Sequence, residues 1–380
     1  MSEKTKKKTK KNLHEKTLII VIDGCAIDYI TKKTTPNLYR LAENGFYKTV
    51  KSALPSVTNV NHACILSGSF PSNHGVVGNY YYNRKTGEEG FIESSRHMKV
   101  DSIIDIYAKA GKSTALLTVK GKVLEVFGQN AQIGINLQKP DAAILEKFAL
   151  PQPPDDVASF ATYDWIFNAC YNVINIANPD LVYCTTNDFM MHNYAPNTKE
   201  AETTMRTMDE WIGKIYDIDP EREIYITADH GMNEKNRVID LQKKLDAAGY
   251  ETFCLLALKD RYMDNHKYQE GGLVYVYVFD EKKISKVMKY LKGCDFVEKV
   301  LDNESAAKKY NLPSDNIGDI LVLSKSDTAF GELEKDELTV KVRTHGSLDE
   351  RKIPLIAVNA RKNKSHYKFS ADIVKVMLGL

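Results

Sequence analysis

Short runs of apolar, mostly β-branched residues recur along the chain and alternate with segments of helical periodicity. Five such runs cover residues 18–22, 113–118, 181–185, 224–228 and 355–359. A strand that is buried on both faces has a continuous apolar sequence, because neither face meets water. Strands of this kind separated by helices are typical of a parallel sheet with helical crossovers. The sequence therefore predicts an α/β fold with a mostly parallel central sheet flanked by helices.

A second region of the chain, residues 241–343, has a compact pattern of its own. It combines several short strand patterns with a lysine-rich amphipathic helix near residues 281–292. The main series of strands resumes after it, so we interpret it as an α+β cap inserted into an α/β core of residues 17–240 and 344–380. The length of 380 residues alone is compatible with two or three domains. The insertion reduces this to one core domain with a cap.

The first 16 residues carry the chain's excess positive charge. They hold seven lysines and two glutamates, whereas the whole chain has a formal net charge of +2, so the remaining body is mildly acidic. A block of like charges repels itself and buries nothing, so we expect residues 1–16 to form a disordered, solubilising tail. Contact of this tail with nucleic acid or an anionic membrane is the alternative.

Three further patterns concern the compartment of the protein. The apolar run at residues 18–22 is shorter than the ~7–15 residues of a signal-peptide core, so we predict no export signal. No apolar run approaches the ~20 residues that span a bilayer. The six cysteines form no CxxC pair and mostly lie in apolar stretches. We therefore expect free thiols in a reducing compartment and a cytoplasmic protein.

Aspartates and histidines follow directly after three of the predicted strands. They are Asp23, Asp188, His192, Asp229 and His230. In open α/β sheets, ligands bind at the carboxyl ends of the strands, so these side chains are candidates for one common site. Asp188 and His192 are four residues apart and would share one face of a helical turn. Taken singly, each residue has an ordinary alternative as a turn residue, a helix cap or a solvated helix residue.

His345 is a sixth candidate ligand. It precedes the last predicted strand, periodicity does not fix its position, and by itself a structural role is the simpler interpretation. As a set, however, three aspartates and three histidines in a chain with nine histidines could bind two divalent ions. Carboxylate and imidazole ligands favour Zn²⁺, with Mn²⁺ or Fe²⁺ as alternatives. Two ions about 4 Å apart can clamp an in-line attack at phosphorus.

Thr58 is the candidate nucleophile. It lies shortly before the apolar residues 63–66, which resemble a buried helix ending at Gly68. A helix N-terminus presents unpaired N–H groups that favour an anion, and a metal-bound threonine loses its proton more easily. Ser56 is the rival hydroxyl, and the structural alternative is that Thr58 only caps the helix.

Taken in order, these residues resemble the motifs of the alkaline phosphatase superfamily. The order Asp23, Thr58, Asp188-x-x-x-His192, Asp229-His230, His345 is most similar to the branch that contains nucleotide pyrophosphatase/phosphodiesterases and phosphonoacetate hydrolases. The resemblance implies an alkaline phosphatase-like fold with residues 241–343 as its cap. It also implies two zinc ions per chain, one held by Asp188, His192 and His345 and the other by Asp23, Thr58, Asp229 and His230.

Further site residues are implied by the resemblance. Asn79 matches an asparagine that donates to a phosphoryl oxygen, and the backbone N–H of Asn59 would assist it. Lys120 and Lys122 follow a predicted strand, at the point where phosphonoacetate hydrolases carry a pair of substrate lysines. Without the resemblance, both would be interpreted as ordinary exposed lysines at the start of a helix.

The implied activity is hydrolysis of the carbon–phosphorus bond of phosphonoacetate to acetate and phosphate, through a phosphothreonine at Thr58. The two lysines would stabilise the charge of the departing enediolate. The alternative is a phosphodiesterase or nucleotide pyrophosphatase with the same two-metal site, for which the tyrosines at residues 80–82 could form an aromatic slot. We expect a small anionic substrate and no membrane or nucleic-acid partner, and a homodimer stays open.

Overall fold

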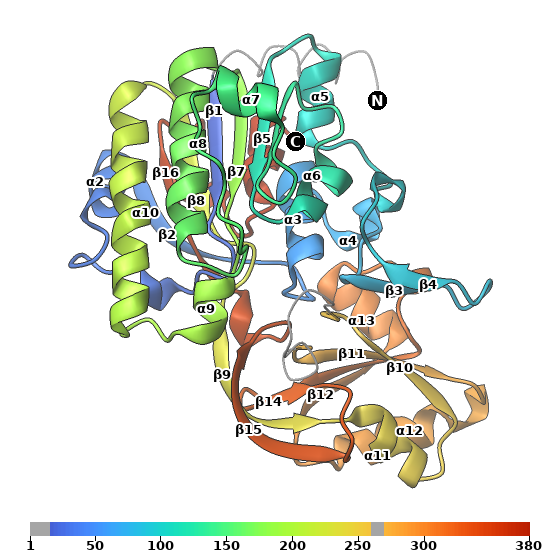
Figure 1. Cartoon of the computed structure of the whole chain (residues 1–380). Coiled ribbons are helices and arrows are strands. Elements are labelled where there is room, and N and C mark those ends of the chain that lie inside the picture. The colour runs from blue at the N-terminus through green and yellow to red at the C-terminus, as the bar shows by residue number, and fades with distance from the viewer. Residues whose placement is uncertain (1–15, 260–269) are drawn as a thin grey trace.

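A computed structural model describes residues 16–259 and 270–380 of the chain. Its centre is a seven-stranded sheet with the strand order β2-β16-β8-β1-β7-β5-β6, which lies in the upper part of Figure 1. The lysine-rich tail predicted at residues 1–16 falls outside the described residues, apart from Lys16.

Five neighbouring strands of the central sheet run parallel, which confirms the predicted α/β fold with a mostly parallel sheet. Every residue of β1, β5, β7 and β8 is buried, as their continuous apolar sequences predict. The parallel strands are β8 (Glu223–Thr227), β1 (Thr17–Val21), β7 (Leu181–Thr185), β5 (Thr114–Thr118) and β6 (Ile133–Asn136).

One strand of the central sheet, next to β8, runs in the opposite direction to its neighbours. β16 (Lys352–Val358) pairs antiparallel with both β8 and β2 (Phe46–Lys51). The amino end of β16 therefore lies at the same edge of the sheet as the carboxyl ends of the parallel strands. The carboxyl end of β2 lies there as well, because Lys51 pairs with Lys352. The segments before β16 and after β2 thus reach the edge where the loops after β1, β7 and β8 begin.

Helices pack around this sheet. α8 (Ala161–Ala177) packs against β5 and β7, and α10 (Lys199–Ile218) lies beside α8 and α2 (Pro36–Asn44), as Figure 1 shows. α3 (Thr58–Ser67) is buried over its whole length. The shorter helices of the core are α4 (Pro71–His74), α5 (Ile103–Lys109), α6 (Gly121–Phe127), α7 (Ala142–Lys147), α9 (Phe189–Asn193) and α14 (Asp372–Met377).

The chain leaves the core along β9 (Asn233–Ile239) and returns along β15 (Glu337–Thr344). These two strands pair antiparallel, and β14 (Thr328–Phe330) joins the other side of β9. The excursion therefore begins before residue 241, at the start of this ribbon. Beyond it lies a four-stranded sheet in the order β10-β11-β13-β12, in the lower lobe of Figure 1. Its elements are β10 (Thr252–Leu256), β11 (Leu273–Val278), β12 (Val297–Asp302), β13 (Ile320–Ser324), α11 (Leu241–Ala247), α12 (Ile284–Lys292) and α13 (Asn303–Tyr310).

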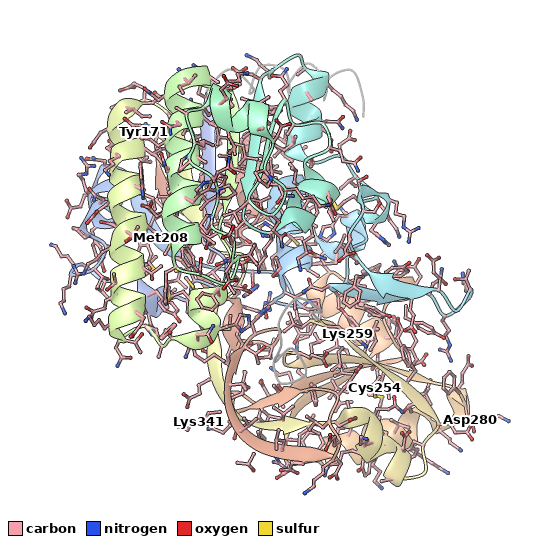
Figure 2. All side chains as sticks on the ribbon, viewed as in Figure 1. Tyr171, Met208, Cys254, Lys259, Asp280 and Lys341 are labelled. Carbon is pink, nitrogen blue, oxygen red and sulfur yellow. The ribbon has the colours of Figure 1, made fainter. Side chains whose placement is uncertain are left out.

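The cap sheet is apolar on both faces, which explains the unbroken apolar sequence of β11. Val274 and Val276 pack in one apolar cluster, and Leu273 and Tyr275 pack in another, because successive side chains of a strand point to opposite faces. In the core, Met208 of α10, labelled in Figure 2, belongs to the main apolar cluster.

A hairpin of β3 (Tyr80–Tyr82) and β4 (Glu89–Phe91), here called the flap, connects the core to the cap. Arg84 in its turn forms an ion pair with Asp319 of the cap at 2.8 Å. At its base, the backbone N–H of Asn79 donates to the carbonyl of Ala257 at 2.8 Å. The flap is therefore fixed to the cap at both ends.

Two expectations about the chain as a whole can be compared with the structure. All six cysteines are free, and four of them are buried. Within the part of the chain that the structure describes, no helix is long and apolar enough to cross a bilayer.

Candidate active site

Three of the predicted acids lie side by side because β1 pairs in register with β7 and β8, so that these strands end level. The loops that follow carry Asp23, Asp188 and Asp229. Gly24 closes the first loop with a φ of +73°, and a Cβ atom there would lie 3.1 Å from the Cβ of Asp188. The left-handed backbone and the close approach both favour glycine. Its N–H donates to Oδ1 of Asp229 at 3.1 Å, which ties the first loop to the third.

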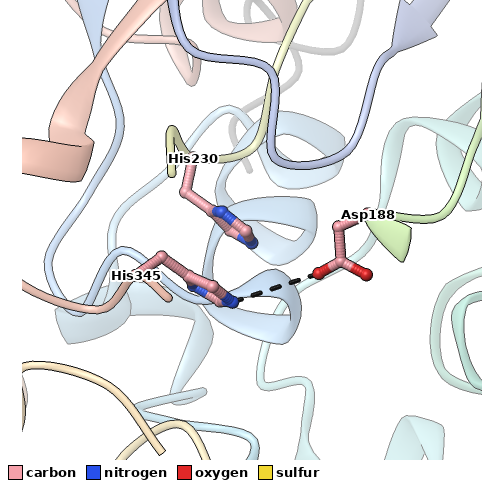
Figure 3. Close-up of side chains that lie close together, drawn as sticks. All are labelled: Asp188, His230 and His345. Carbon is pink, nitrogen blue, oxygen red and sulfur yellow. Dashed lines mark ion pairs between the residues drawn. The ribbon is translucent and has the colours of Figure 1, made fainter. Parts of the chain in front are cut away.

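One group of candidate ligands consists of Asp188, His192 and His345. Asp188 is the residue just before α9 and its side chain makes no capping hydrogen bond, so its carboxylate is available, and His192 follows one helical turn later. Its Nε2 atom lies 3.3 Å from Oδ2 of Asp188. His345 reaches the same oxygen from the loop before β16, with its Nε2 at 4.0 Å (Figure 3). The reversed direction of β16 is what brings this histidine, distant in sequence, to the edge of the sheet.

A second group consists of Asp23, Asp229 and His230. Nε2 of His230 lies 3.3 Å from Oδ2 of Asp229 and 3.5 Å from Oδ1 of Asp23. The two groups adjoin, because the rings of His230 and His345 stack with centroids 3.5 Å apart (Figure 3). Ligand atoms of Asp23, Asp229 and His230 lie within 4.8 Å of one another, as do those of Asp188, His230 and His345. Buried sets of carboxylates and imidazoles at this spacing fit divalent metal ions.

The three histidines of these groups are all oriented by backbone carbonyls. Nδ1 of His192 lies 2.7 Å from a carbonyl of β15, that of His230 lies 3.0 Å from the next residue's carbonyl, and that of His345 lies 2.7 Å from the carbonyl of Ser56. A carbonyl can only accept, so in each ring Nδ1 carries a proton, and Nε2 is the nitrogen that faces the acids and can bind a metal ion. A neutral imidazole held in this way is the form that binds a metal ion.

The acids are crowded and buried, and their pKa values reflect it. Burial, followed by repulsion from Asp188 and Asp229, raises the pKa of Asp23 well above its usual value. Burial raises the pKa of Asp229 to about 6. Burial also opposes ionisation of Asp188, but the ammonium of Lys120 holds the pKa of this carboxyl well below its usual range. Oδ2 of Asp229 has no hydrogen-bond donor among the described residues. Added positive charge would relieve this repulsion and supply the missing partner.

Thr58 is the first residue of α3, and its side chain points into the second group of ligands. Its Oγ1 lies 3.4 Å from Nε2 of His230. The capping position belongs to Val57, and no side chain caps this helix. The structural alternative, in which Thr58 serves as the helix cap, is therefore wrong. The N-terminus of the buried helix α3 therefore lies beside the second group of ligands.

The loop before Thr58 is fixed by side chains. Oδ1 of Asn61 accepts from the N–H of Ala53 at 2.7 Å, and its Nδ2 donates to the carbonyl of Pro55 at 3.1 Å. The rival hydroxyl, Ser56, donates to the carbonyl of Ser347 at 2.7 Å. Its hydroxyl is thus used in joining two loops, whereas that of Thr58 faces the candidate ligands.

Asn79 and Asn59 interact differently from the sequence expectation. The backbone N–H of Asn59 donates to Oδ1 of Asn79 at 3.1 Å, so this N–H is already paired. Because a backbone N–H can only donate, the contact also fixes which end of the Asn79 carboxamide is oxygen. Asn79 keeps its Nδ2 donors for another acceptor.

Lys120 lies at the centre of the site. Its Nζ is 2.7 Å from Oδ2 of Asp23 and 2.8 Å from Oδ1 of Asp188, and its side chain is 19% exposed. Burial opposes its charge, but Asp188 and Asp23 together raise its pKa above the usual value, so the ammonium is retained. It is therefore not an ordinary exposed lysine. Lys122 is half-buried at the start of α6.

His62 is a buried site residue that the sequence analysis did not single out. Its Nε2 lies 4.0 Å from Oδ2 of Asp229, and its Nδ1 lies 2.6 Å from the hydroxyl of Tyr183. Burial, followed by the charge of Lys120, lowers the pKa of His62 well below its usual value. The signal that could have found it is its spacing of four residues from Thr58, which puts both on one helix face.

The tyrosines of β3 each pack against a neighbouring ring. The centroids are 4.9 Å apart for Tyr80 and Phe91, 4.7 Å for Tyr81 and His97, and 4.7 Å for Tyr82 and a phenylalanine of β10. These contacts lie within the flap and between the flap and the cap, and the three tyrosine side chains stay partly exposed.

Comparison with known proteins adds an independent line of evidence. The family model for type I phosphodiesterase / nucleotide pyrophosphatase matches residues 17–348. An uncharacterized pyrophosphatase/phosphodiesterase of Schizosaccharomyces pombe is 26% identical over 254 residues, which covers 60% of this chain and 47% of that protein. A bis(5'-adenosyl)-triphosphatase of Homo sapiens is 22% identical over 253 residues, with 63% and 52% covered. The chain spans about half the length of the curated relatives it matches.

Solved structures resemble the chain over nearly its whole length. The phosphonoacetate hydrolase of Sinorhizobium meliloti 1021, in complex with phosphonoformate, superimposes with a TM-score of 0.85 at 27% identity and covers 96% of this chain and 95% of its own. Murine ectonucleotide pyrophosphatase / phosphodiesterase 5 shares the fold at 18% identity, with a TM-score of 0.66 and 96% and 95% covered. Because the family model matches most of the chain, this protein belongs to the type I phosphodiesterase / nucleotide pyrophosphatase family of the alkaline phosphatase superfamily.

Proposed function

We propose that the chain is a two-zinc hydrolase that cleaves the carbon–phosphorus bond of phosphonoacetate and releases acetate and phosphate in the cytoplasm. The observation that carries this proposal is the set of three buried histidines. In each histidine, Nδ1 donates a hydrogen bond to a backbone carbonyl, and Nε2 faces the acids beside Thr58. The similarity to the Sinorhizobium meliloti phosphonoacetate hydrolase, which was solved with phosphonoacetate bound, supports the choice of substrate.

The proposed ligands divide between the two groups. Asp188, His192 and His345 would hold one ion, and Asp23, Thr58, Asp229 and His230 would hold the other. Bound there, the two ions would lower the pKa of the Thr58 hydroxyl and neutralise charge on the phosphoryl oxygens. Carboxylate and imidazole donors are compatible with Zn²⁺, and also with Mn²⁺ or Fe²⁺.

Thr58 would release its hydroxyl proton to solvent and attack phosphorus through Oγ1, in line with the departing carbon. As the Oγ1–P bond forms, the P–C bond breaks, and its electron pair passes to the carbon and spreads onto the substrate's carboxylate as an enediolate. Protonation of that carbon from solvent gives acetate. Water then attacks the phosphothreonine, the P–Oγ1 bond breaks, and phosphate leaves as the Thr58 hydroxyl is restored. The Nδ2 donors of Asn79 would stabilise an equatorial phosphoryl oxygen throughout.

Lys120 would make carbon a tolerable leaving group. A carbanion is costly to form, and a nearby ammonium in a site largely closed to water stabilises the developing charge far better than bulk water does. The ammonium of the partly buried Lys120 lies within 2.8 Å of an acid from each group, so a compact substrate in the site would meet it. Lys122 would extend the positive region toward the substrate's carboxylate. An ester oxygen, in contrast, departs readily without such help.

The second candidate is a phosphodiesterase or nucleotide pyrophosphatase with the same two-metal site. The family match favours it, since that model describes phosphodiesterases. Its aromatic slot would have to be formed by the β3 tyrosines, which stay partly exposed but each pack against a neighbouring ring.

One comparison of substrates tests the proposed function. Zinc-loaded protein is incubated with phosphonoacetate and, separately, with a nitrophenyl phosphodiester, and phosphate and nitrophenol are measured. We expect phosphate from phosphonoacetate at a rate well above that of ester cleavage. Rapid nitrophenol release without phosphate from phosphonoacetate would favour the phosphodiesterase instead.

The metal assignment gives a separate prediction. We expect about two zinc ions per chain in the parent protein and about one in a His345→Ala variant, because the first group loses one of its few ligands. Metal content after dialysis is measured by atomic emission. His366→Ala is the matched control, because this histidine is exposed and bonds only to nearby Asn363 and Ser365 in the described structure. Two ions retained in His345→Ala would remove His345 from the ligand set.

A further inference from the structure

We propose that a buried ion pair, Lys235 with Glu350, is a positioning element that holds the loops of His230 and His345 in register with each other and with the cap. The inference rests on the proposed function only in taking these two histidines as metal ligands. Nζ of Lys235 lies 2.8 Å from Oε1 of Glu350, and both side chains are fully buried. Neither residue belongs to the ligand groups or contacts the substrate in the proposed mechanism.

Glu350 uses both carboxylate oxygens and its backbone. Ser347 lies two residues after His345. Oε2 of Glu350 accepts from the N–H of Ser347 at 2.9 Å and from its hydroxyl at 2.7 Å. The backbone carbonyl of Glu350 accepts from the N–H of Gly231 at 2.7 Å, directly after His230. One residue thus anchors the chain beside each of the two stacked histidines.

The same contacts extend to the loop of the nucleophile. The carbonyl of Ser347, whose N–H is held by Glu350, accepts from the hydroxyl of Ser56 at 2.7 Å. The carbonyl of Ser56 in turn accepts a hydrogen bond from Nδ1 of His345 at 2.7 Å. A displacement of Ser347 would therefore move the carbonyl of Ser56, which orients His345. Ser56 itself lies two residues before Thr58.

Lys235 connects this centre to the cap. It lies on β9, where the chain leaves the core, and its Nζ also donates to the carbonyl of Ser326 at 2.9 Å, in the turn before β14. Asn233, at the start of β9, donates to Oε1 of Glu350 at 2.9 Å. The pair therefore lies where the cap ribbon, the turn after His230 and the loop after His345 meet.

The attraction between the two charges is not expected to add much to the free energy of unfolding, so we assign the pair a positioning role. Desolvating two charges is costly, and replacing a buried ion pair with apolar residues of similar volume is often neutral or stabilising for the fold. Such a replacement cannot, however, accept the N–H and hydroxyl of Ser347. Residues behind metal ligands that fix their orientation commonly change metal affinity by about 10–100-fold when mutated.

The test compares the double variant Lys235→Met/Glu350→Leu with the parent full-length protein. We expect the metal-free protein to stay folded but to melt at a lower temperature than the parent, because the donors of Ser347 and Asn233 lose their acceptor. The zinc dissociation constant, measured by competition with a chelator, is expected to rise at least about 10-fold, and the visible spectrum of the Co²⁺-loaded protein to change in intensity. Unchanged zinc affinity together with an unchanged Co²⁺ spectrum would overturn the proposal and leave the pair a purely structural role.

A matched control is the largely buried pair Arg361 and Glu223, whose side chains are 13% and 1% exposed and lie 2.8 Å apart. Glu223 begins β8, at the edge of the sheet opposite the site. Arg361→Met/Glu223→Leu should change stability and leave the zinc constant unchanged; an equal loss of zinc affinity would count against a specific role for Lys235. If Lys235→Met/Glu350→Leu does not fold, Ser347→Ala removes only one bond to Glu350 and should still weaken zinc binding severalfold.

The outcome is separable from that of the proposed function, because zinc and Co²⁺ binding are measured without substrate. A parent protein that binds both metals but releases no phosphate from phosphonoacetate would refute the proposed function and leave this inference in force. A parent protein that binds neither zinc nor Co²⁺ would overturn both.

Discussion

Replacing Thr58 with alanine is expected to lower phosphate release from phosphonoacetate by at least about 10³-fold, because the covalent route through phosphothreonine disappears. Thr58 is 2% exposed, and its hydroxyl lies 3.4 Å from a candidate ligand, Nε2 of His230. Loss of this contact should cost the fold no more than about 1 kcal/mol. The variant should therefore melt close to the parent and fail in chemistry.

Two variants control this prediction. Thr58→Ser keeps a hydroxyl at the same Cβ atom and should retain measurable turnover. Ser56→Ala removes the rival hydroxyl, which donates to Ser347 at 2.7 Å, and should stay active with slightly lower stability. Acid-quenched parent protein should carry a phosphate on the peptide that contains Thr58, detected by mass spectrometry. Full activity in Thr58→Ala would exclude this residue as the nucleophile.

Replacing Lys120 with methionine is expected to reduce phosphonoacetate turnover by about 10²–10³-fold, the usual cost of losing one group that stabilises transition-state charge. Cleavage of a nitrophenyl phosphodiester should fall much less, because an aryloxide departs without an ammonium beside it. The ratio of the two rates is the measurement. Lys122→Met should change this ratio in the same direction if Lys122 meets the substrate carboxylate, and an unchanged ratio would remove it from the site.

Metal binding must be measured in parallel for Lys120→Met. Nζ of Lys120 lies within 2.8 Å of Asp23 and Asp188, so its removal could also alter metal affinity. The comparison is valid at equal metal content, which atomic emission gives. Lys109→Met is the matched control, since this exposed lysine pairs with Asp101 and should leave both rates unchanged. An equal fall in both activities of Lys120→Met would argue against a role in carbon–phosphorus cleavage.

Strands were predictable where they are buried on both faces. β1, β7 and β8 lie within one residue of the predicted apolar runs, because a strand without a solvent face has no polar residues to interrupt its sequence. β2 and β15 were not predicted. The side chains of β2 are mostly exposed or partly buried, and its sequence has neither an apolar run nor an alternation. β15 does alternate polar and apolar residues, as a strand with one solvent face does, but it contains no unbroken apolar run.

Some residues of the candidate site were predictable from the ends of the buried strands, and His345 was not. The residues Asp23, Asp188, Asp229 and His230 stand directly after buried strands, so topology alone predicts that they meet. His345 could be included only through the resemblance of the whole set to a family. Its arrival at the same edge depends on the reversed direction of β16, and a strand's direction is set by its pairing partners.

The sequence by itself determined the fold class, the order of the chemical groups and the family resemblance, because these follow from local burial patterns and residue identity. Only the tertiary structure decided that Nδ1 of each ligand histidine faces a backbone carbonyl, that the Thr58 hydroxyl faces the candidate ligands, and that the N–H of Asn59 is paired with Asn79. The structure also revealed Lys235 and Glu350, which lie 115 residues apart in the chain. Such contacts are decided by how distant segments pack, and no local pattern of residues records that.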